Sequence, residues 1–84
     1  MTGPVTIYKR VQPAEAYLYT GHNADQIVAW ATGHAYIAEG HLYIITDRGD
    51  AIAEPGDHII RGLVGEYYPI TPAAYQAGWQ EGPA

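Results

Sequence analysis

The sequence predicts an α+β fold: a small antiparallel β-sheet or meander of about five to seven short strands, one capped α-helix near residues 23–33 and a short C-terminal helix near residues 72–79. Short runs rich in isoleucine, valine and tyrosine alternate with turn residues over most of the chain. A helical period interrupts them once, and a threonine–proline pair marks a second helix start. The 84 residues are expected to form a single domain, 1–84.

Two strands are expected at the start of the chain. VTIYK, residues 5–9, alternates apolar and polar side chains at a period of two, and EAYLYT, residues 15–20, repeats the pattern. Pro13 precedes the second run and has no N–H to donate to a neighbouring strand. The segment therefore forms either a first strand pair or one bent strand, with Pro13 at an edge or in an irregular connection.

The segment GHNADQIVAWATG carries both ends of a helix. Asn23 is a capping residue, Gln26 stands where a capping box places Glu or Gln, and Gly33 can adopt the left-handed conformation that ends a helix. Apolar residues recur at spacings of three and four, which places them on one face. They are Ala24, Ile27, Val28 and Ala31.

After this helix the period changes to that of strands. AYIA, LYIIT, AIAE, DHIIR and EYYPI are separated by EGH, DRGD, PGD and GLVG, a pattern that predicts a meander of antiparallel hairpins. Thr71 and Pro72 then supply a capping hydroxyl and a proline at the first helical position. In the short helix that follows, Tyr75 and Trp79 share one face, and residues 80–84 are expected to fray.

The stretch AEPGDHIIR contains a turn followed by a strand without a polar face. Pro55 and Gly56 suit the two central positions of a type II turn. In DHIIR, alternation places Ile60 on one face and both Ile59 and Arg61 on the other. We expect a helix to cover one face of this strand, and another sheet or another subunit to cover the other.

GLVG and EYYPI follow, and both favour contact with another molecule. Gly62 and Gly65 bracket Leu63 and Val64 in a turn whose apolar tip is exposed. Pro69 cannot donate to a central ladder, so its strand is expected at a sheet edge. An apolar edge strand is a liability in a monomer. We therefore expect association of identical chains, and the expected interface residues are Leu63, Val64, Tyr75 and Trp79.

Composition excludes several classes of function. A domain this small has a marginal core, and without cysteine it has no disulfide, which again favours a homo-oligomer. A formal charge of −5 opposes general nucleic-acid binding. The chain has neither an apolar run long enough to cross a bilayer nor a secretion signal at its start, so no membrane association and a cytoplasmic location are expected.

The sequence carries no catalytic signature. Serine and cysteine are absent, so the usual nucleophiles are missing and no catalytic residue is predicted. The histidines at 22, 34, 41 and 58 lack the spacing of a metal site, and no metal or other cofactor is expected. DRGD, residues 47–50, contains a cell-adhesion tripeptide and two carboxylates, but it lacks the further ligands of a calcium loop and is typical of a hairpin tip.

A site for a small anionic ligand is predicted around Arg61. The guanidinium fork, the backbone N–H groups of nearby glycines and tyrosine rings are the groups that a nucleotide or phosphorylated metabolite needs. The expected ligand-binding residues are Arg61, Tyr67, Tyr68, Arg10, Gly62 and Gly65. The alternative is a structural arginine that pairs with Glu66 or Asp57 beside core tyrosines.

PGDHIIRGLVGEYYPITPAAY closely resembles a motif of small bacteriophage and prophage proteins, in which PGD is followed by two isoleucines, a basic residue, glycine and then GEFYP. Tyr67 stands where phenylalanine is usual and Ile70 where cysteine is common. EAYLYTG is similar to the family's EAxQWTG. The matching residues are Pro55, Gly56, Asp57, Ile59, Ile60, Arg61, Gly62, Gly65, Glu66, Tyr68 and Pro69.

The resemblance implies a phage origin and, with it, the host-cell cytoplasm, but no particular reaction. Three functions are open. The first is a non-enzymatic, oligomeric sponge that sequesters an anionic nucleotide-derived immune signal of the host, by analogy only. The second is a protein-binding inhibitor of a host factor or a small virion component, which would use the tip at Leu63 and Val64. A small enzyme ranks last.

Overall fold

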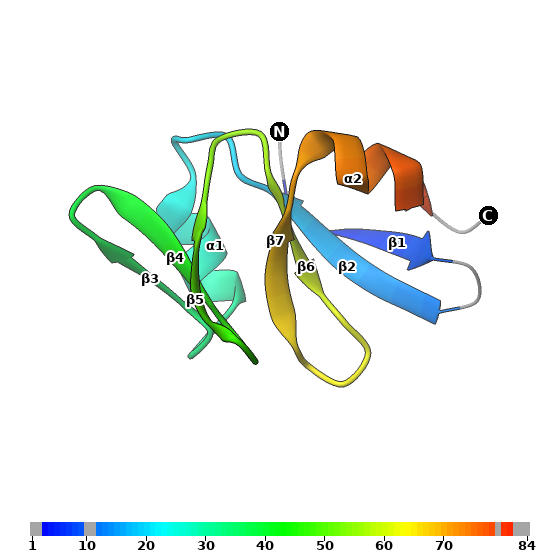
Figure 1. Cartoon of the computed structure of the whole chain (residues 1–84), viewed down its shortest axis with the longest axis horizontal. Coiled ribbons are helices and arrows are strands. Elements are labelled where there is room, and N and C mark those ends of the chain that lie inside the picture. The colour runs from blue at the N-terminus through cyan, green and yellow to red at the C-terminus, as the bar shows by residue number, and fades with distance from the viewer. Residues whose placement is uncertain (1–2, 10–11, 79, 82–84) are drawn as a thin grey trace.

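The protein is α+β, as the sequence predicts. The structure is a computed structural model that describes residues 3–9, 12–78 and 80–81. Within these residues, the chain forms two antiparallel sheets and two short helices (Figure 1). In chain order the elements are β1 Val5–Lys9, β2 Gln12–Leu18, α1 Ala24–Trp30, β3 Ala35–Ala38, β4 His41–Thr46, β5 Gly49–Ala53, β6 His58–Arg61, β7 Tyr67–Ile70, α2 Pro72–Gly78 and β8 Gln80–Glu81.

The strands divide between two sheets. Strands β3, β4 and β5 form the expected meander, whereas the other sheet has the order β7-β6-β2-β1-β8. The chain leaves the meander at the turn between β5 and β6, where the N–H of Gly56 donates to the carbonyl of Tyr19 (2.7 Å) and the N–H of Tyr19 donates to that of Asp57 (2.9 Å). These bonds place β6 beside β2 instead of β5, so the sheet breaks there.

The turn before β6 and the positions of Pro13 and Pro69 agree with the sequence prediction. The N–H of Asp57 donates to the carbonyl of Glu54 (2.9 Å) and Gly56 has φ 99°, as a type II turn requires. At Pro13, β2 pairs with β1 but is beyond the reach of β6. Pro69 lies in β7, which is an edge strand of its sheet. The first strand pair is therefore a hairpin, and both prolines occupy positions where the missing N–H costs no central hydrogen bond.

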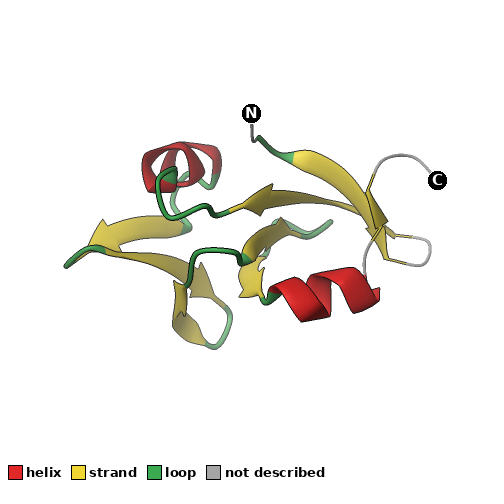
Figure 2. Ribbon diagram, turned by 90° about the horizontal axis from the view of Figure 1, so that it is seen from above, coloured by secondary structure: helices red, strands yellow, loops and turns green. Residues whose placement is uncertain are grey.

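Strand β6 separates two hydrophobic clusters. Ile59 and Ile60 are both 0% exposed and point to opposite faces. Ile59 packs in a cluster with residues of α1, β4 and β5, and Ile60 packs against Tyr75 of α2. Figure 2 shows the two helices on opposite sides of the five-stranded sheet. The cover expected on both faces of β6 is thus supplied by this chain's own second sheet and helices.

Helix α1 begins where the sequence predicts but is not capped as predicted. Asn23 stands at the N-cap position, yet its side chain makes no capping bond. Its Oδ1 instead accepts from the backbone N–H of Thr20 (2.9 Å), and its Nδ2 donates to the carbonyl of Leu18 (2.8 Å). The capping prediction was wrong because the buried amide ties the end of β2 to the helix start. The helix also ends early, at Trp30, and Gly33 takes its positive φ of 80° in the turn beyond.

The C-terminal helix follows the predicted start. The Oγ1 of Thr71 accepts a hydrogen bond from the N–H of Ala74 at 3.2 Å, as a helix cap does. Tyr75, expected at a subunit interface, is 7% exposed and lies in the chain's own core. Trp79, also expected at an interface, lies outside the described residues. Of the predicted frayed tail, residues 80–81 form a short strand beside β1.

Truncation of either isoleucine of β6 is expected to destabilise the fold strongly. Ile59→Ala or Ile60→Ala each removes buried methyl groups from a closed cluster and should cost about 2 to 5 kcal/mol of unfolding free energy. Urea denaturation measures this loss. The matched control is Ile52→Ala, because Ile52 is 44% exposed and its loss should matter by less than about 1 kcal/mol. Equal losses at all three positions would contradict the two-cluster arrangement.

Removal of the Asn23 amide is expected to cost about 1 to 3 kcal/mol, because Asn23→Ala leaves the Leu18 carbonyl and the Thr20 N–H without their partly buried hydrogen bonds. Thermal or urea unfolding measures the change. Gln26→Ala is the control: Gln26 is exposed on α1, so its truncation should leave stability nearly unchanged. A similar loss for both variants would instead favour a conventional capping box.

Candidate functional site

Arg61 is held by partners within the chain. Glu15, Arg61 and Tyr67 are aligned across β2, β6 and β7. The Nη2 of Arg61 forms an ion pair with the Oε1 of Glu15, and its Nη1 donates to the hydroxyl of Tyr67 at 3.4 Å. The sequence interpretation offered Glu66 or Asp57 as the acidic partner. The structural pairing exists, but Glu15 of the neighbouring strand supplies the carboxylate.

An aromatic cluster surrounds this arginine. Its guanidinium carbon lies 5.4 Å from the ring centroid of Trp30, and Trp30 meets Tyr17 and Tyr67 edge-on at centroid distances of 5.3 and 5.5 Å. His34 stacks on Tyr67 at 4.5 Å. The hydrogen bond that Arg61 donates to Tyr67, together with the negative charge of Glu15, raises the pKa of Arg61 above its ordinary value, although burial acts in the opposite direction. The cluster therefore joins α1 to the five-stranded sheet through a permanent cation.

The glycines beside Arg61 are used by the hairpin itself. The N–H of Gly62 donates to the carbonyl of Glu66 at 2.9 Å, and the N–H of Gly65 donates to that of Gly62 at 3.1 Å. A Cβ at position 62 would overlap the Glu66 carboxylate. Gly62 thus makes room for Glu66, and the N–H groups expected to receive a ligand already have acceptors. Arg10, the second basic residue expected at the site, lies outside the described residues.

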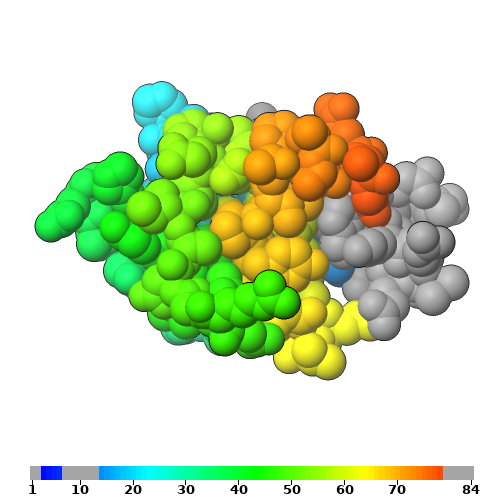
Figure 3. All heavy atoms as spheres, viewed as in Figure 1, coloured from blue at the N-terminus to red at the C-terminus, as the bar shows by residue number. Residues whose placement is uncertain are grey.

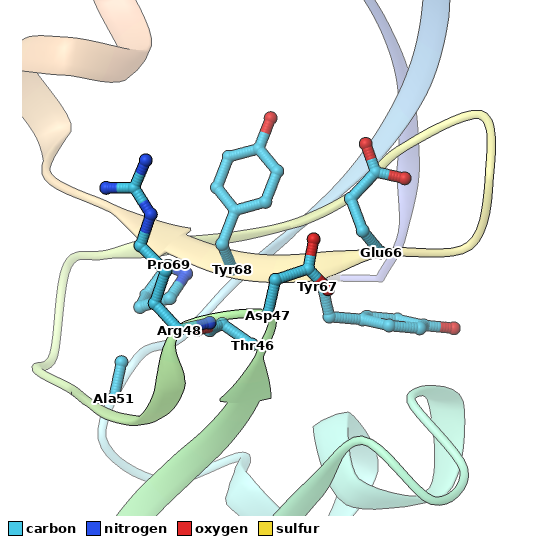
Figure 4. A pocket seen from close by; sticks show the side chains of 8 residues that line it. All are labelled: Thr46, Asp47, Arg48, Ala51, Glu66, Tyr67, Tyr68 and Pro69. Atoms are coloured by element: carbon cyan, nitrogen blue, oxygen red, sulfur yellow. The ribbon is translucent and has the colours of Figure 1, made fainter.

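A pocket lies between the β4–β5 turn and β7 (Figure 4). Its volume is about 440 Å³. Of the predicted ligand-binding residues it includes Tyr67 and Tyr68, but not Arg61, Gly62 or Gly65. The lining residues are Thr46, Asp47, Arg48, Ala51, Glu66, Tyr67, Tyr68 and Pro69.

Arg48 supplies the cation of this pocket. The hairpin tip predicted for DRGD is confirmed: the hydroxyl of Thr46 donates to the carbonyl of Gly49 (2.7 Å) and accepts from the N–H of Arg48 (3.1 Å). The Arg48 side chain is exposed, and within the described part of the chain its guanidinium has no hydrogen bond or ion pair. The sequence prediction did not include Arg48. The signal that could have identified it is the small number of basic residues, four in the whole sequence.

Tyr68 lies between a positive and a negative group. In Figure 4 the side chains of Arg48, Tyr68 and Glu66 extend in the same direction, with Tyr68 in the middle. Burial, and then the negative charge of Glu66, raise the pKa of the Tyr68 phenol, so its hydroxyl stays protonated and can donate. The pocket thus offers a guanidinium and a phenol at one end and the carboxylates of Asp47 and Glu66 nearby.

The tip of the β6–β7 hairpin is apolar and exposed, as predicted. Leu63 is 59% exposed and Val64 is 89% exposed. The tip projects at the lower edge of the molecule in Figure 3. A smaller hollow of about 240 Å³ adjoins it, with Leu63, Arg61 and Glu15 in its wall. Arg61 therefore lines a hollow, but its ion-pair partner Glu15 lines the same hollow.

Three of the four histidines contact tyrosine rings. His34 stacks on Tyr67, His41 meets Tyr43 edge-on, and His58 stacks on Tyr75 at a centroid distance of 3.6 Å. Among the residues that the structure describes, no group of three or more metal-ligating side chains is close enough to hold an ion. Neither helix in the described ranges is long and apolar enough to cross a membrane.

Loss of Arg61 is expected to weaken the fold, whereas loss of Arg48 is not. Arg61→Met removes an ion pair and a cation–π contact at a partly exposed position, which together contribute about 1 kcal/mol. Arg48→Met removes an exposed side chain without a partner and should change stability by less than about 0.5 kcal/mol. Urea denaturation of the two variants, at low and high salt, makes the comparison. A larger loss for Arg48→Met would overturn the assignment of roles.

No protein-family model, curated protein or solved structure matches this chain. The phage motif therefore stays a prediction from the sequence.

Proposed function

We propose that this chain is a non-enzymatic binding module whose pocket, between the β4–β5 turn and β7, holds a small nucleotide-type ligand by its anionic group. The observation that carries this proposal is the guanidinium of Arg48, exposed at the pocket and without a partner in the described part of the chain. Strand β7 contributes the two adjacent tyrosines, one on each face, and Pro69.

Arg48 suits the anionic end of such a ligand. A guanidinium binds a phosphate through two parallel hydrogen bonds, and these are stronger than bonds between neutral groups. The protonated hydroxyl of Tyr68 is a further donor on the same side of the pocket. In a chain with a formal charge of −5, an anion needs such a local cation to overcome the repulsion of the whole molecule.

The remaining pocket suits the neutral end of the ligand. The ring of Tyr68 and the apolar side chains of Ala51 and Pro69 offer surface for a nucleobase, since every base can stack on an aromatic ring. The carboxylates of Asp47 and Glu66 can accept hydrogen bonds from sugar hydroxyls or base amino groups. They also repel further negative charge. The favoured ligand therefore carries its charge at one end and hydrogen-bond donors at the other.

Sequestration is the role that this binding would serve. The motif of residues 55–69, which resembles small phage proteins, supports a phage-encoded module that acts in the host-cell cytoplasm. The absence of serine and cysteine from the chain supports binding without turnover. A homo-oligomer is part of the same proposal, because a domain of 84 residues has a small core and the hairpin tip exposes apolar surface.

A second function is favoured by a different observation. Val64 is 89% exposed and Leu63 is 59% exposed at the end of a projecting hairpin. An apolar tip of this kind can insert into a pocket of another protein. On this alternative, the chain inhibits a host factor or serves as a small accessory component of the virion, and the pocket at Arg48 has no part in binding.

Calorimetry against nucleoside monophosphates, nucleoside diphosphates and cyclic dinucleotides tests the first function. Arg48→Gln is expected to weaken binding of the best compound about tenfold or more, because a charged hydrogen bond to phosphate is lost. Gln26→Glu, at an exposed position on α1 outside the pocket lining, lowers the net charge by the same amount and is the matched control, expected to bind nearly as the wild type does. Binding by Arg48→Gln equal to that of the control would overturn the assignment.

The hairpin-tip alternative has its own variant. Leu63→Ser with Val64→Ser should leave nucleotide binding intact if the pocket at Arg48 is the site. No heat from any compound on the panel, together with loss of a host partner in the tip variant alone, would establish the second function in place of the first.

A further inference from the structure

One face of the three-stranded sheet carries large side chains that α1 does not cover. Tyr36, Tyr43 and Ile52 lie side by side across β3, β4 and β5, because Tyr36 pairs with Tyr43 and Tyr43 with Ile52. Ile45 lies two residues beyond Tyr43 and therefore on the same face. We call these four residues the tyrosine face. Leu42 and Ile44 point the other way, into the cluster that includes residues of α1.

The tyrosine face is exposed as a unit. Tyr36 is 37% exposed, Ile45 is 38% exposed and Ile52 is 44% exposed. Single exposed apolar residues are ordinary on any protein. These, however, are neighbours through the strand register, so they form one continuous apolar surface, and such surfaces mark sites of contact.

The rings on this face are fixed in advance of any contact. Tyr36 and Tyr43 stack with 5.0 Å between centroids and 5° between planes, and His41 meets Tyr43 edge-on. The hydroxyl of Tyr36 donates to the Oδ2 of Asp50 at 2.6 Å, which raises the pKa of the phenol and keeps it protonated. Because these side chains are already ordered, binding a partner here would cost this protein little side-chain entropy.

The charge beside the tyrosines has one sign. Asp50 is the one side chain with a formal charge in β3, β4 and β5, and Glu39 stands in the turn between β3 and β4. Arg48 belongs to the next turn and lines the pocket instead. An aromatic face beside a carboxylate attracts a cation and repels a phosphate. A second copy would bring the same carboxylates to a two-fold contact, where like charges oppose one another.

We propose that the tyrosine face docks a cationic, β-prone segment of a partner protein, with an arginine or lysine over the tyrosine rings beside Asp50 and aliphatic side chains on Ile45 and Ile52. This surface is separate from the pocket at Arg48. A module with both features binds a small ligand in one place and a basic protein segment in another.

Nuclear magnetic resonance titration with the blocked pentapeptide Arg-Val-Arg-Val-Arg tests the proposal. The expected result is a set of amide shift changes confined to β3, β4 and β5, with weak, saturable binding. The peptide Glu-Val-Glu-Val-Glu is the charge-reversed control and should cause no such changes. Equal effects from both peptides, or changes centred on another part of the chain, would overturn the proposal.

Two variants separate the contributions of charge and ring. Asp50→Asn keeps an oxygen that can accept from Tyr36 but removes the charge, and Tyr36→Ser removes the exposed ring. Each should weaken binding of the arginine peptide about two- to fivefold, the range of an exposed cation–π or ionic contact. Gln26→Ala, at an exposed position on α1, is the matched control and should bind as the wild type does.

Sedimentation tests whether a second copy of this chain covers the tyrosine face instead of a basic partner segment. If the wild type forms a dimer that Tyr36→Ser or Ile52→Lys dissociates, the tyrosine face is covered by a second copy and the proposal is overturned. Unchanged peptide affinity in Asp50→Asn, with its spectrum showing the native fold, would overturn it equally.

Discussion

Everything in this fold depends on a strand that has no solvent face. Ile59 and Ile60 are adjacent in β6, point in opposite directions and are both 0% exposed. Two layers must therefore cover a strand of four residues, and a chain of 84 residues supplies them with a three-stranded sheet and α1 on one side and α2 on the other. This demand brings the β4–β5 turn against β7 and so creates the pocket. The candidate site thus follows from the packing of these layers around β6.

Features that depend on neighbours in sequence could be predicted. The proline–glycine turn before β6, the Thr71 cap and the edge position of Pro69 each follow from a few consecutive residues. Features that depend on distant pairing could not. The break between the two sheets follows from backbone bonds between Tyr19 and the turn that contains Gly56. Asn23 has the composition of a cap, but a polar side chain chooses among nearby acceptors only once β2 has been placed.

The candidate site was half predicted, for the same reason. Tyr67 and Tyr68 stood out as a doubled aromatic in an edge strand, and both line the pocket. Arg61 was the expected cation, but its partner Glu15 lies 46 residues away in the sequence and no local pattern reveals it. Arg48 sits in a turn whose shape its neighbours explain completely, so nothing drew attention to its side chain. The two arginines lie in different surroundings: Arg61, in β6, braces α1 through Trp30, whereas Arg48, in the β4–β5 turn, faces solvent.

The proline in β7 also bears on how the protein behaves at high concentration. An exposed strand edge offers a row of backbone donors and acceptors to which another chain can add, and short apolar strands with tyrosines are prone to such growth into fibrils. Pro69 interrupts that row, because it has no N–H and its ring obstructs an incoming strand. Strand β7 can thus hold two tyrosines beside an open pocket without serving as a template for aggregation.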